Sequence, residues 1–160
     1  MNLELFEPEQ NDNLLPCDGI VQDFGLILDH VQSQKYLNYF LQHLAWQQDE
    51  VYLHGQYFQT ERKVVWYGDD NFQYHYSGLA KQAHVWNPAL FRLKQHIEQL
   101  TGQRYNSCLA NLYENGTQGV GWHSDDEPSL VSHDQEVTIA SSNFGATRTV
   151  RFEHKWKNKK

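Results

Sequence analysis

The sequence of 160 residues lacks several features that would place it in a protein class at once. No apolar run approaches the length of about 20 residues that a membrane-spanning helix needs. The first residues, MNLELFEPEQ, lack the basic start and apolar stretch of a secretory signal peptide. Cysteine is scarce, because Cys17 and Cys108 are too few for a disulfide framework. These absences predict a soluble protein of a reducing, cytoplasmic compartment, with no membrane partner.

Basic side chains are missing from the first part of the chain. Residues 1–34 contain seven Asp and Glu and no Lys or Arg, whereas the remainder carries 13 charges of each sign. The net charge of -7 therefore arises at the N-terminal end. The last 13 residues contain six basic side chains and one acidic one, a local charge of +5. Such a cluster could neutralise phosphates, and a solvated polar end explains it equally well.

The composition of the chain is sufficient for one folded domain. Hydrophobic residues make up 39% of the chain and aromatic residues 14%, so disorder is excluded. Residues 1–19 contain Pro8 and Pro16, which oppose regular structure, and are predicted to form a loosely structured acidic lead-in. Residues 20–160 are predicted to form the domain.

Two stretches have the apolar periodicity of helices. The first is predicted at 33–48, with Ser33 as its cap. The second begins after the predicted cap Asn87, has Pro88 at its first position, and ends before Gly102. The apolar faces consist of Leu37, Phe40, Leu41 and Leu44 in the first helix and Leu90, Leu93, Ile97 and Leu100 in the second.

Four other stretches have the composition of strands. They are 51–59, 63–67, 105–113 and 147–154, which are rich in β-branched and aromatic residues or alternate with a period of two. In 105–113 the alternation places Leu109, Asn111 and Tyr113 on one face. The turn signal NGTQG follows this stretch. Helices followed by strands predict an α+β protein whose β portion is a sandwich or jelly roll.

The segment GWHSDDE, residues 121–127, has a histidine and three carboxylates within five positions. Chance alone would give about half a His-x-Asp in a chain of this composition, so the tripeptide by itself decides nothing. On a strand His123 and Asp125 would project to one face, whereas on a helix they would point about 200° apart. One imidazole and one carboxylate, joined by a second histidine, form the facial triad of non-haem Fe(II) oxygenases. Zinc accepts the same ligands and is the alternative metal.

The surroundings of this segment resemble a known family. NLYENGTQGVGWHSDDE is similar to the metal-binding segment of AlkB-type 2-oxoglutarate- and Fe(II)-dependent dioxygenases, which repair alkylated nucleic acids. ERKVVWYGD, YHYSGL, NLY, HSDDE and FGATRTVRFEHK follow one another in the family's order and spacing between about residues 60 and 155. The resemblance is greatest to the subgroup that acts on double-stranded DNA.

The resemblance implies a double-stranded β-helix, or jelly roll, and an activity. The expected reaction is oxidative demethylation of 1-methyladenine and 3-methylcytosine in DNA, with RNA as an open alternative substrate. It uses Fe(II), 2-oxoglutarate and O2 and releases formaldehyde and succinate. The protein is expected to be a monomer. Two alternatives stay open: an inactive DNA-binding remnant, and a dioxygenase of the same fold that acts on protein or small molecules.

The resemblance also implies roles for individual residues. His123 and Asp125 match the Fe(II) ligands and the catalytic centre. Asn111 and Tyr113 match the N-x-Y motif that hydrogen-bonds 2-oxoglutarate, and Leu109 lies on their strand face. Without the resemblance, Asn111 would be a polar residue at a strand end and Tyr113 a core aromatic.

The remaining matches concern the nucleic acid. Tyr74 and Tyr76 match an aromatic strip that stacks on the damaged base, with Ser77 beside it. Glu127 matches an acidic residue near the exocyclic nitrogen of that base. The stretch 62–63 matches basic residues that meet the DNA backbone; it consists of Arg62 and Lys63.

The chain departs from the family pattern at its C-terminal end. It stops at HKWKNKK, where the family continues with further strands that contain the distal metal histidine and the arginines for the co-substrate carboxylate. Neither His133 nor His154 matches the distal ligand. We therefore expect an incomplete jelly roll and a site that lacks a matched third ligand. A natural truncation and a fragment explain this equally well.

Overall fold

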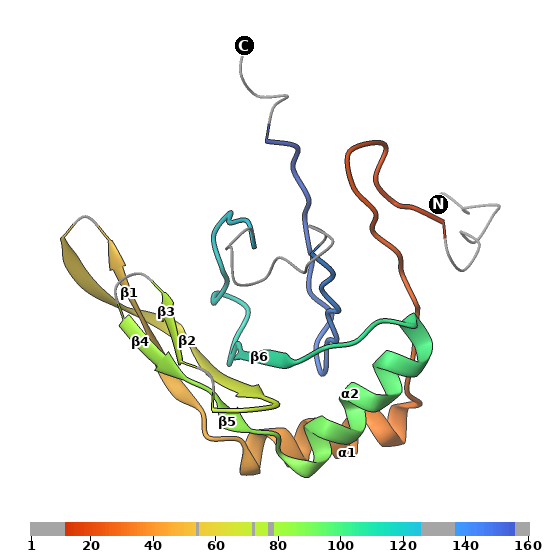
Figure 1. Cartoon of the computed structure of the whole chain (residues 1–160), viewed down its shortest axis with the longest axis horizontal. Helices are drawn as coiled ribbons and strands as arrows, with labels where there is room; N and C mark the ends of the chain where they lie inside the picture. Colours follow the sequence, from red (N-terminus) through yellow and green to blue (C-terminus); the bar gives the residue numbers. More distant parts are fainter. Residues whose placement is uncertain (1–11, 54, 72, 77–78, 126–136, 156–160) are drawn as a thin grey trace. The chain divides into compact units, whose positions relative to one another are not determined.

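The computed structural model describes residues 12–53, 55–71, 73–76, 79–125 and 137–155. Their secondary structure is α+β, which confirms the predicted class (Figure 1). None of the helices in this part of the chain is long and apolar enough to cross a membrane. The elements are α1 (His30–His43), β1 (Gln47–Leu53), β2 (Gln56–Gly68), β3 (Gln73–Tyr76), β4 (Leu79–Gln82), β5 (His84–Val85), α2 (Pro88–Thr101) and β6 (Ser107–Leu112).

The chain divides into two compact units. One consists of residues 1–38 and 144–160, and the other of residues 39–143. The second unit contains all the strands that the structure assigns and every residue of the predicted site. The predicted boundary between a lead-in and a domain after residue 19 stays a prediction.

The strand β2 organises the main sheet. Its first part, from Gln56 to Val64, pairs antiparallel with β1, and its second part, from Lys63 to Gly68, pairs antiparallel with β6. The short β5 runs parallel to the last two residues of β2. Figure 1 shows β2 as the long strand that these three elements join, while β3 and β4 form a separate two-stranded sheet. The sheet is partial, and the jelly roll stays a prediction.

The first predicted strand is wrong in its extent. Residues 51–59 do not form one strand, because the chain reverses within them between β1 and β2. Gly55 has a φ of 81°, a left-handed conformation that glycine adopts without strain. The prediction missed this turn because the residues on both sides have strand propensity. The predicted strand 63–67 lies inside β2 and is confirmed.

Helix α1 is displaced from its predicted range of 33–48. It begins three residues earlier, because the Asp29 carboxylate accepts an amide hydrogen of the first turn at 2.7 Å. The amide of Ser33 donates to the carbonyl of Asp29 at 2.9 Å, so Ser33 lies inside the helix and is not its cap. At the other end the Trp46 indole N–H donates to the Phe40 carbonyl, and the chain continues directly into β1.

Helix α2 has the ends that its sequence predicts. The side chain of Asn87 accepts the amide hydrogen of Ala89 at 2.9 Å, and proline occupies the first helical position. Gly102 ends the helix with a φ of 70°, and its amide donates to the carbonyl of Glu98. The predicted cap, first residue and stop are all confirmed.

The buried apolar side chains come from the end of α1 and the residue after it, the second half of β2, the residue before β5 and the first half of α2. They are Phe40, Leu44, Val64, Val65, Tyr67, Ala83, Ala89, Leu90 and Leu93. Two residues predicted for the apolar helix faces, Leu41 and Leu100, are exposed. The spacing of apolar residues predicts which side of a helix is apolar, but only the part of that side that faces other elements becomes buried.

The later strand predictions differ in outcome. The stretch 105–113 contains β6, so that strand is confirmed. Residues 147–154 have no strand assignment, so that prediction is wrong. Strand propensity expresses how well residues fit into a sheet. A segment with this propensity forms a strand only when it pairs with another strand.

Candidate metal and co-substrate site

The face of β6 that was predicted to hold the co-substrate is the accessible one. Leu109 and Asn111 are exposed, whereas Ala110 and Leu112 on the opposite face are half-buried. Asn111 lies opposite Val64 in the ladder with β2. The period-two alternation of this stretch therefore gives the faces as predicted. The contact of Asn111 with 2-oxoglutarate stays a prediction.

A buried ion pair lies at the end of β6. The guanidinium of Arg62 donates to one carboxylate oxygen of Asp49 from both Nε and Nη2, at 3.2 and 2.8 Å. The Asp49 side chain is only 1% exposed and that of Arg62 14%. Arg62 also hydrogen-bonds Tyr113, the first residue after β6. Burial opposes the charged form of Arg62, but these hydrogen bonds outweigh it and raise the pKa of its guanidinium.

The adjacent lysine has different surroundings. Lys63 Nζ forms an ion pair with Glu114 at 2.7 Å, and both side chains are substantially exposed, at 39% and 49%. The predicted DNA-backbone roles of Arg62 and Lys63 stay predictions. The structure places the charge of Arg62 against Asp49 and leaves that of Lys63 near solvent.

The turn between β6 and the histidine is held by side chains. The amide of Glu114 donates to the buried side chain of Gln118 at 2.6 Å. Within this loop both the amide and the hydroxyl of Thr117 donate to the Asn115 carboxamide oxygen, at 2.9 and 2.6 Å. The turn predicted at 115–119 is confirmed, and it fixes the start of the segment that leads to His123.

His123 and Asp125 lie beside each other on one segment. Nε2 of His123 is 3.6 Å from Oδ1 of Asp125, and the two side chains are 51% and 48% exposed. Nδ1 of His123 lies 2.9 Å from the carbonyl oxygen of Gly121. Because a carbonyl only accepts, Nδ1 carries a proton, and in a neutral ring the lone pair is then on Nε2, the nitrogen that lies near Asp125. The segment is irregular, so this closeness arises without the predicted strand.

These two side chains fit an iron or zinc ion as two of its ligands. Their 3.6 Å separation is close to the distance of about 3–3.5 Å between adjacent ligands that each lie about 2.1 Å from one ion. A backbone carbonyl that orients the imidazole is a usual partner of a metal-binding histidine. Among the residues that the structure describes, no third His, Cys, Asp or Glu joins this pair. His133, one of the two histidines compared with the distal ligand, lies outside the described residues.

The predicted base pocket is described only in part. Tyr74 and Tyr76 lie in β3, opposite Lys81 and Leu79 of β4. Ser77 and Glu127, the other predicted substrate residues, lie outside the described residues. The aromatic wall for a flipped base stays a prediction.

Two further residues shape this region, and no sequence pattern predicted them. Asp49 anchors Arg62, and Gln118 holds the turn before His123. No sequence signal marked Asp49, because a carboxylate beside another acidic residue is usually solvated. The position of Gln118 between a threonine and a glycine indicated a turn, but not that its side chain closes that turn.

Comparisons with known proteins indicate the same family as the motifs of this region. A family model of the 2OG-Fe(II) oxygenase superfamily matches residues 24–160. The chain therefore belongs to the 2OG-Fe(II) oxygenase superfamily. Within it, the chain is 38% identical over 128 residues to alpha-ketoglutarate-dependent dioxygenase alkB homolog 3 of Homo sapiens. The predicted resemblance to AlkB-type dioxygenases is thereby confirmed.

Two further relatives carry the name DNA oxidative demethylase ALKBH2. The protein of Homo sapiens is 37% identical over 124 residues and that of Mus musculus 32% identical over 148 residues. The match to alkB homolog 3 covers 80% of this chain and 43% of that relative. The match to human ALKBH2 covers 78% of this chain and 45% of the relative, and the match to mouse ALKBH2 covers 88% and 59%. The chain thus spans less than two thirds of the length of these proteins.

Proposed function

We propose that the protein to which these residues belong removes methyl groups oxidatively from N-alkylated bases in DNA. The proposed substrates are 1-methyladenine and 3-methylcytosine, and the proposed co-substrates are 2-oxoglutarate and O2. Fe(II), when bound, supplies the activation of O2 that the oxidation of an N-methyl group requires. A monomeric state and a cytoplasmic location stay predictions.

The residues of the chain would divide the remaining tasks. His123 and Asp125 would hold the iron, because Nε2 of the imidazole and Oδ1 of the carboxylate lie 3.6 Å apart, and a neutral ring with its proton on Nδ1 binds a metal through Nε2. Asn111 and Tyr113 would orient 2-oxoglutarate by hydrogen bonds. Arg62 would keep the Tyr113 hydroxyl in place, since its own position is fixed by Asp49.

The nucleic-acid side of the proposal rests on the aromatic pair of β3. Tyr74 and Tyr76 would stack on the flipped base, which is worth about 1–3 kcal/mol per base. Ser77 and Glu127 would contact its edge, and Lys63 would lie near the phosphates. The named relatives, which include DNA oxidative demethylases, support this choice of substrate.

One observation supports the metal role more directly than any other. The Gly121 carbonyl selects the His123 tautomer whose free nitrogen points at Asp125, at 3.6 Å. In the neutral ring this arrangement leaves Nε2 free to bind a metal ion together with Asp125.

The proposal is tested on protein expressed from the full reading frame that encodes these residues. The protein is incubated with Fe(II), ascorbate, 2-oxoglutarate and an oligonucleotide that contains 1-methyladenine or 3-methylcytosine, and both formaldehyde and the repaired base are measured. We expect turnover that His123→Ala abolishes. Absence of repair in folded, iron-loaded protein would contradict the proposal.

A second variant separates the substrate from the chemistry. Tyr76→Ala should weaken binding to methylated DNA and leave 2-oxoglutarate consumption without DNA largely intact, while Tyr76→Phe should retain both because it keeps the stacking ring. If Tyr76→Ala reduced both activities equally, Tyr76 would be structural and the base-stacking role would be lost. Consumption of 2-oxoglutarate without any repair of DNA would favour a dioxygenase that acts on another class of molecule.

A further inference from the structure

A short loop near the N-terminus is tied into a fixed shape. The carboxamide oxygen of Asn13 accepts the amide hydrogens of Leu15 and Val21, at 3.1 and 2.8 Å. The amide nitrogen of the same side chain donates to the carbonyl of Gly19 at 2.8 Å. A backbone hydrogen bond from Leu14 to Val21 closes the loop at 2.8 Å. One asparagine therefore holds both ends of this loop together.

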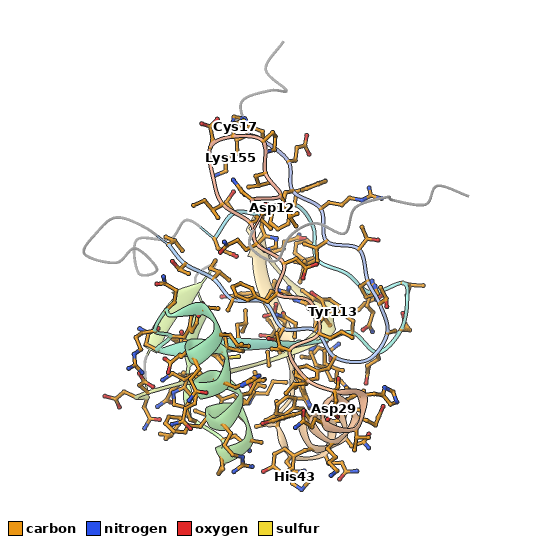
Figure 2. All side chains as sticks on the ribbon, turned by 90° about the vertical axis from the view of Figure 1, so that its right-hand side faces the viewer. Asp12, Cys17, Asp29, His43, Tyr113 and Lys155 are labelled. Atoms are coloured by element: carbon orange, nitrogen blue, oxygen red, sulfur yellow. The ribbon has the colours of Figure 1, made fainter. Side chains whose placement is uncertain are left out.

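The loop presents two metal-ligating side chains to a third from the other end of the sequence. Cys17 and Asp18 lie at its tip, and Nε2 of His154 is 2.9 Å from Oδ2 of Asp18. The candidate ligand atoms of Cys17, Asp18 and His154 all lie within 4.8 Å of one another. Figure 2 shows Cys17 at the same end of this unit as Lys155, the chain neighbour of His154.

This spacing suits a four-coordinate ion. Ligands at the usual zinc distances of about 2.0–2.3 Å lie about 3.3–3.8 Å apart in a tetrahedron. The separation of Asp18 and His154, 2.9 Å, is shorter than this, and the upper limit of 4.8 Å for the group is longer. Rotamer changes of the exposed Cys17 and Asp18 side chains can close both differences, while His154 is half-buried.

The chemistry of the three donors selects the metal. A thiolate is a soft ligand that favours Zn²⁺ over Mg²⁺ or Ca²⁺, and imidazole and carboxylate complete common zinc donor sets. Cys17 is exposed, so an ion can reach its sulfur. Cys108 differs, because burial raises the pKa of its thiol to about 11 and keeps it protonated.

We propose that Cys17, Asp18 and His154 form a zinc site with one position left for water. The site uses none of the residues assigned to iron, so it does not depend on the proposed function. Because Asp18 and His154 are 136 residues apart in the sequence, the ion would close a long loop between the two ends of the chain. Zinc binding would therefore stabilise the folded chain.

Cobalt substitution tests the site on the chain as it stands. Purified protein is titrated with Co²⁺, which gives a near-ultraviolet sulfur-to-metal charge-transfer band only when a thiolate is a ligand. We expect this band, together with visible absorption of four-coordinate Co²⁺, and loss of both when Zn²⁺ is added. Zn²⁺ should also raise the Tm of the chain. Absence of the charge-transfer band would overturn the proposal.

Matched variants assign the sulfur and the other ligands. Cys17→Ser should abolish the band, whereas Cys108→Ser should leave it unchanged. His154→Ala and Asp18→Asn should each weaken zinc binding by more than about tenfold, since even the partners of ligands contribute about 10–100-fold. His123→Ala should have no effect on the band. A band that survives Cys17→Ser, or one that Cys108→Ser removes, would contradict the assignment.

A measurement without variants guards against a misfolded Cys17→Ser protein. The thiols of the unaltered chain are alkylated with iodoacetamide in the presence and absence of Zn²⁺, and each cysteine is identified by mass spectrometry. Zn²⁺ should slow the alkylation of Cys17 at least tenfold and leave the slow reaction of Cys108 unchanged. Equal rates for Cys17 with and without Zn²⁺ would refute the site.

Discussion

Arg62 and Lys63 are neighbours in β2, and their charges are held in different surroundings. Arg62 faces a carboxylate that is almost fully buried, whereas Lys63 faces one that is about half exposed. An ion pair near solvent contributes little, because water and salt screen it. Removing one partner of a buried pair leaves an uncompensated charge, which is strongly destabilising.

Asp49→Asn should therefore destabilise the protein by about 3–5 kcal/mol, the cost of breaking a buried ion pair. Glu114→Gln, which breaks the exposed pair with Lys63, should cost no more than about 1 kcal/mol and is the matched control. Urea unfolding followed by circular dichroism gives both free energies. If the two substitutions cost the same, the burial of the Asp49–Arg62 pair has no energetic consequence.

For single residues, the sequence predicted which side chains lie near one another along the chain better than it predicted their burial and long-range partners. The alternation of β6 follows from covalent geometry, and the structure agrees with it. His123 and Asp125 lie close together as predicted, but on an irregular segment and not on the predicted strand. The burial of Asp49 could not be predicted, because it depends on Arg62, 13 residues away across a hairpin. A long-range pair of this kind has no periodic signal.

Among the elements, α2 shows how local chemistry fixes both ends of a helix. Its start and stop were predicted because a capping asparagine, a first-turn proline and a terminal glycine act on the backbone within a few residues. The predicted range of α1 was displaced because the sequence offers two possible caps, Asp29 and Ser33, and Asp29 is the one that caps the helix. The hairpin of β1 and β2 was missed because the residues on both sides of its glycine turn have strand propensity.

Gly102→Ala tests the C-terminal end of α2. The residue has a φ of 70°, and an added Cβ would meet no atom within 4 Å, so the cost is conformational. We expect a loss of about 1–2 kcal/mol, the penalty of the left-handed conformation for an L residue. The control is Gly116→Ala, whose Cβ also meets open space without a positive φ, and which should change stability by no more than about 0.5 kcal/mol. Equal losses from urea unfolding would exclude the conformational explanation.

Glu98 should make the stability of α2 depend on pH. Its carboxylate accepts the amide hydrogen of Tyr105 at 3.0 Å and lies 3.4 Å from Lys94 and 3.3 Å from Arg104. The hydrogen bond from Tyr105, with help from these cations, lowers the pKa of Glu98 below its ordinary value of 4.5. A lowered pKa in the folded state stabilises the protein above 4.5, and this contribution is lost as the pH falls through the folded value.

Glu98→Gln should therefore reduce stability at neutral pH, and the difference from the unaltered protein should shrink as the pH falls below 4.5. Arg104→Gln is the matched control: it removes the weakest of these contributions and should leave most of the pH dependence in place. Unfolding in urea across this pH range measures both. A difference that is constant with pH would show that the Glu98 charge has no role.

For the whole molecule, the class was predictable and the arrangement of the sheet was not. Helix and strand periods give an α+β protein, but they do not say which strands become neighbours. Residues 147–154 illustrate this limit, because they have the composition of a strand and no strand assignment. Family motifs located the region of the site, while the partner of each strand depends on contacts that no local pattern contains.

The last prediction concerns the 160 residues as a separate protein. Within its described part, the proposed ligands His123 and Asp125 lie close together without a third His, Cys, Asp or Glu beside them. A third ligand would also fix the geometry of the ion, so two ligands should bind Fe(II) weakly and orient it poorly. Both effects act on the same step of the reaction and should therefore compound.

We expect these 160 residues alone to show no measurable demethylation of 1-methyladenine or 3-methylcytosine, although weak DNA binding should survive. The measurement is formaldehyde release with Fe(II), ascorbate, 2-oxoglutarate and methylated oligonucleotide, with His123→Ala as control. Robust turnover that this control abolishes would contradict the prediction. It would also mean that another histidine of the chain completes the iron site, and His133→Ala and His154→Ala would then identify it. If His154 were that histidine, the iron site would compete with the zinc site, because His154 cannot bind both ions at once.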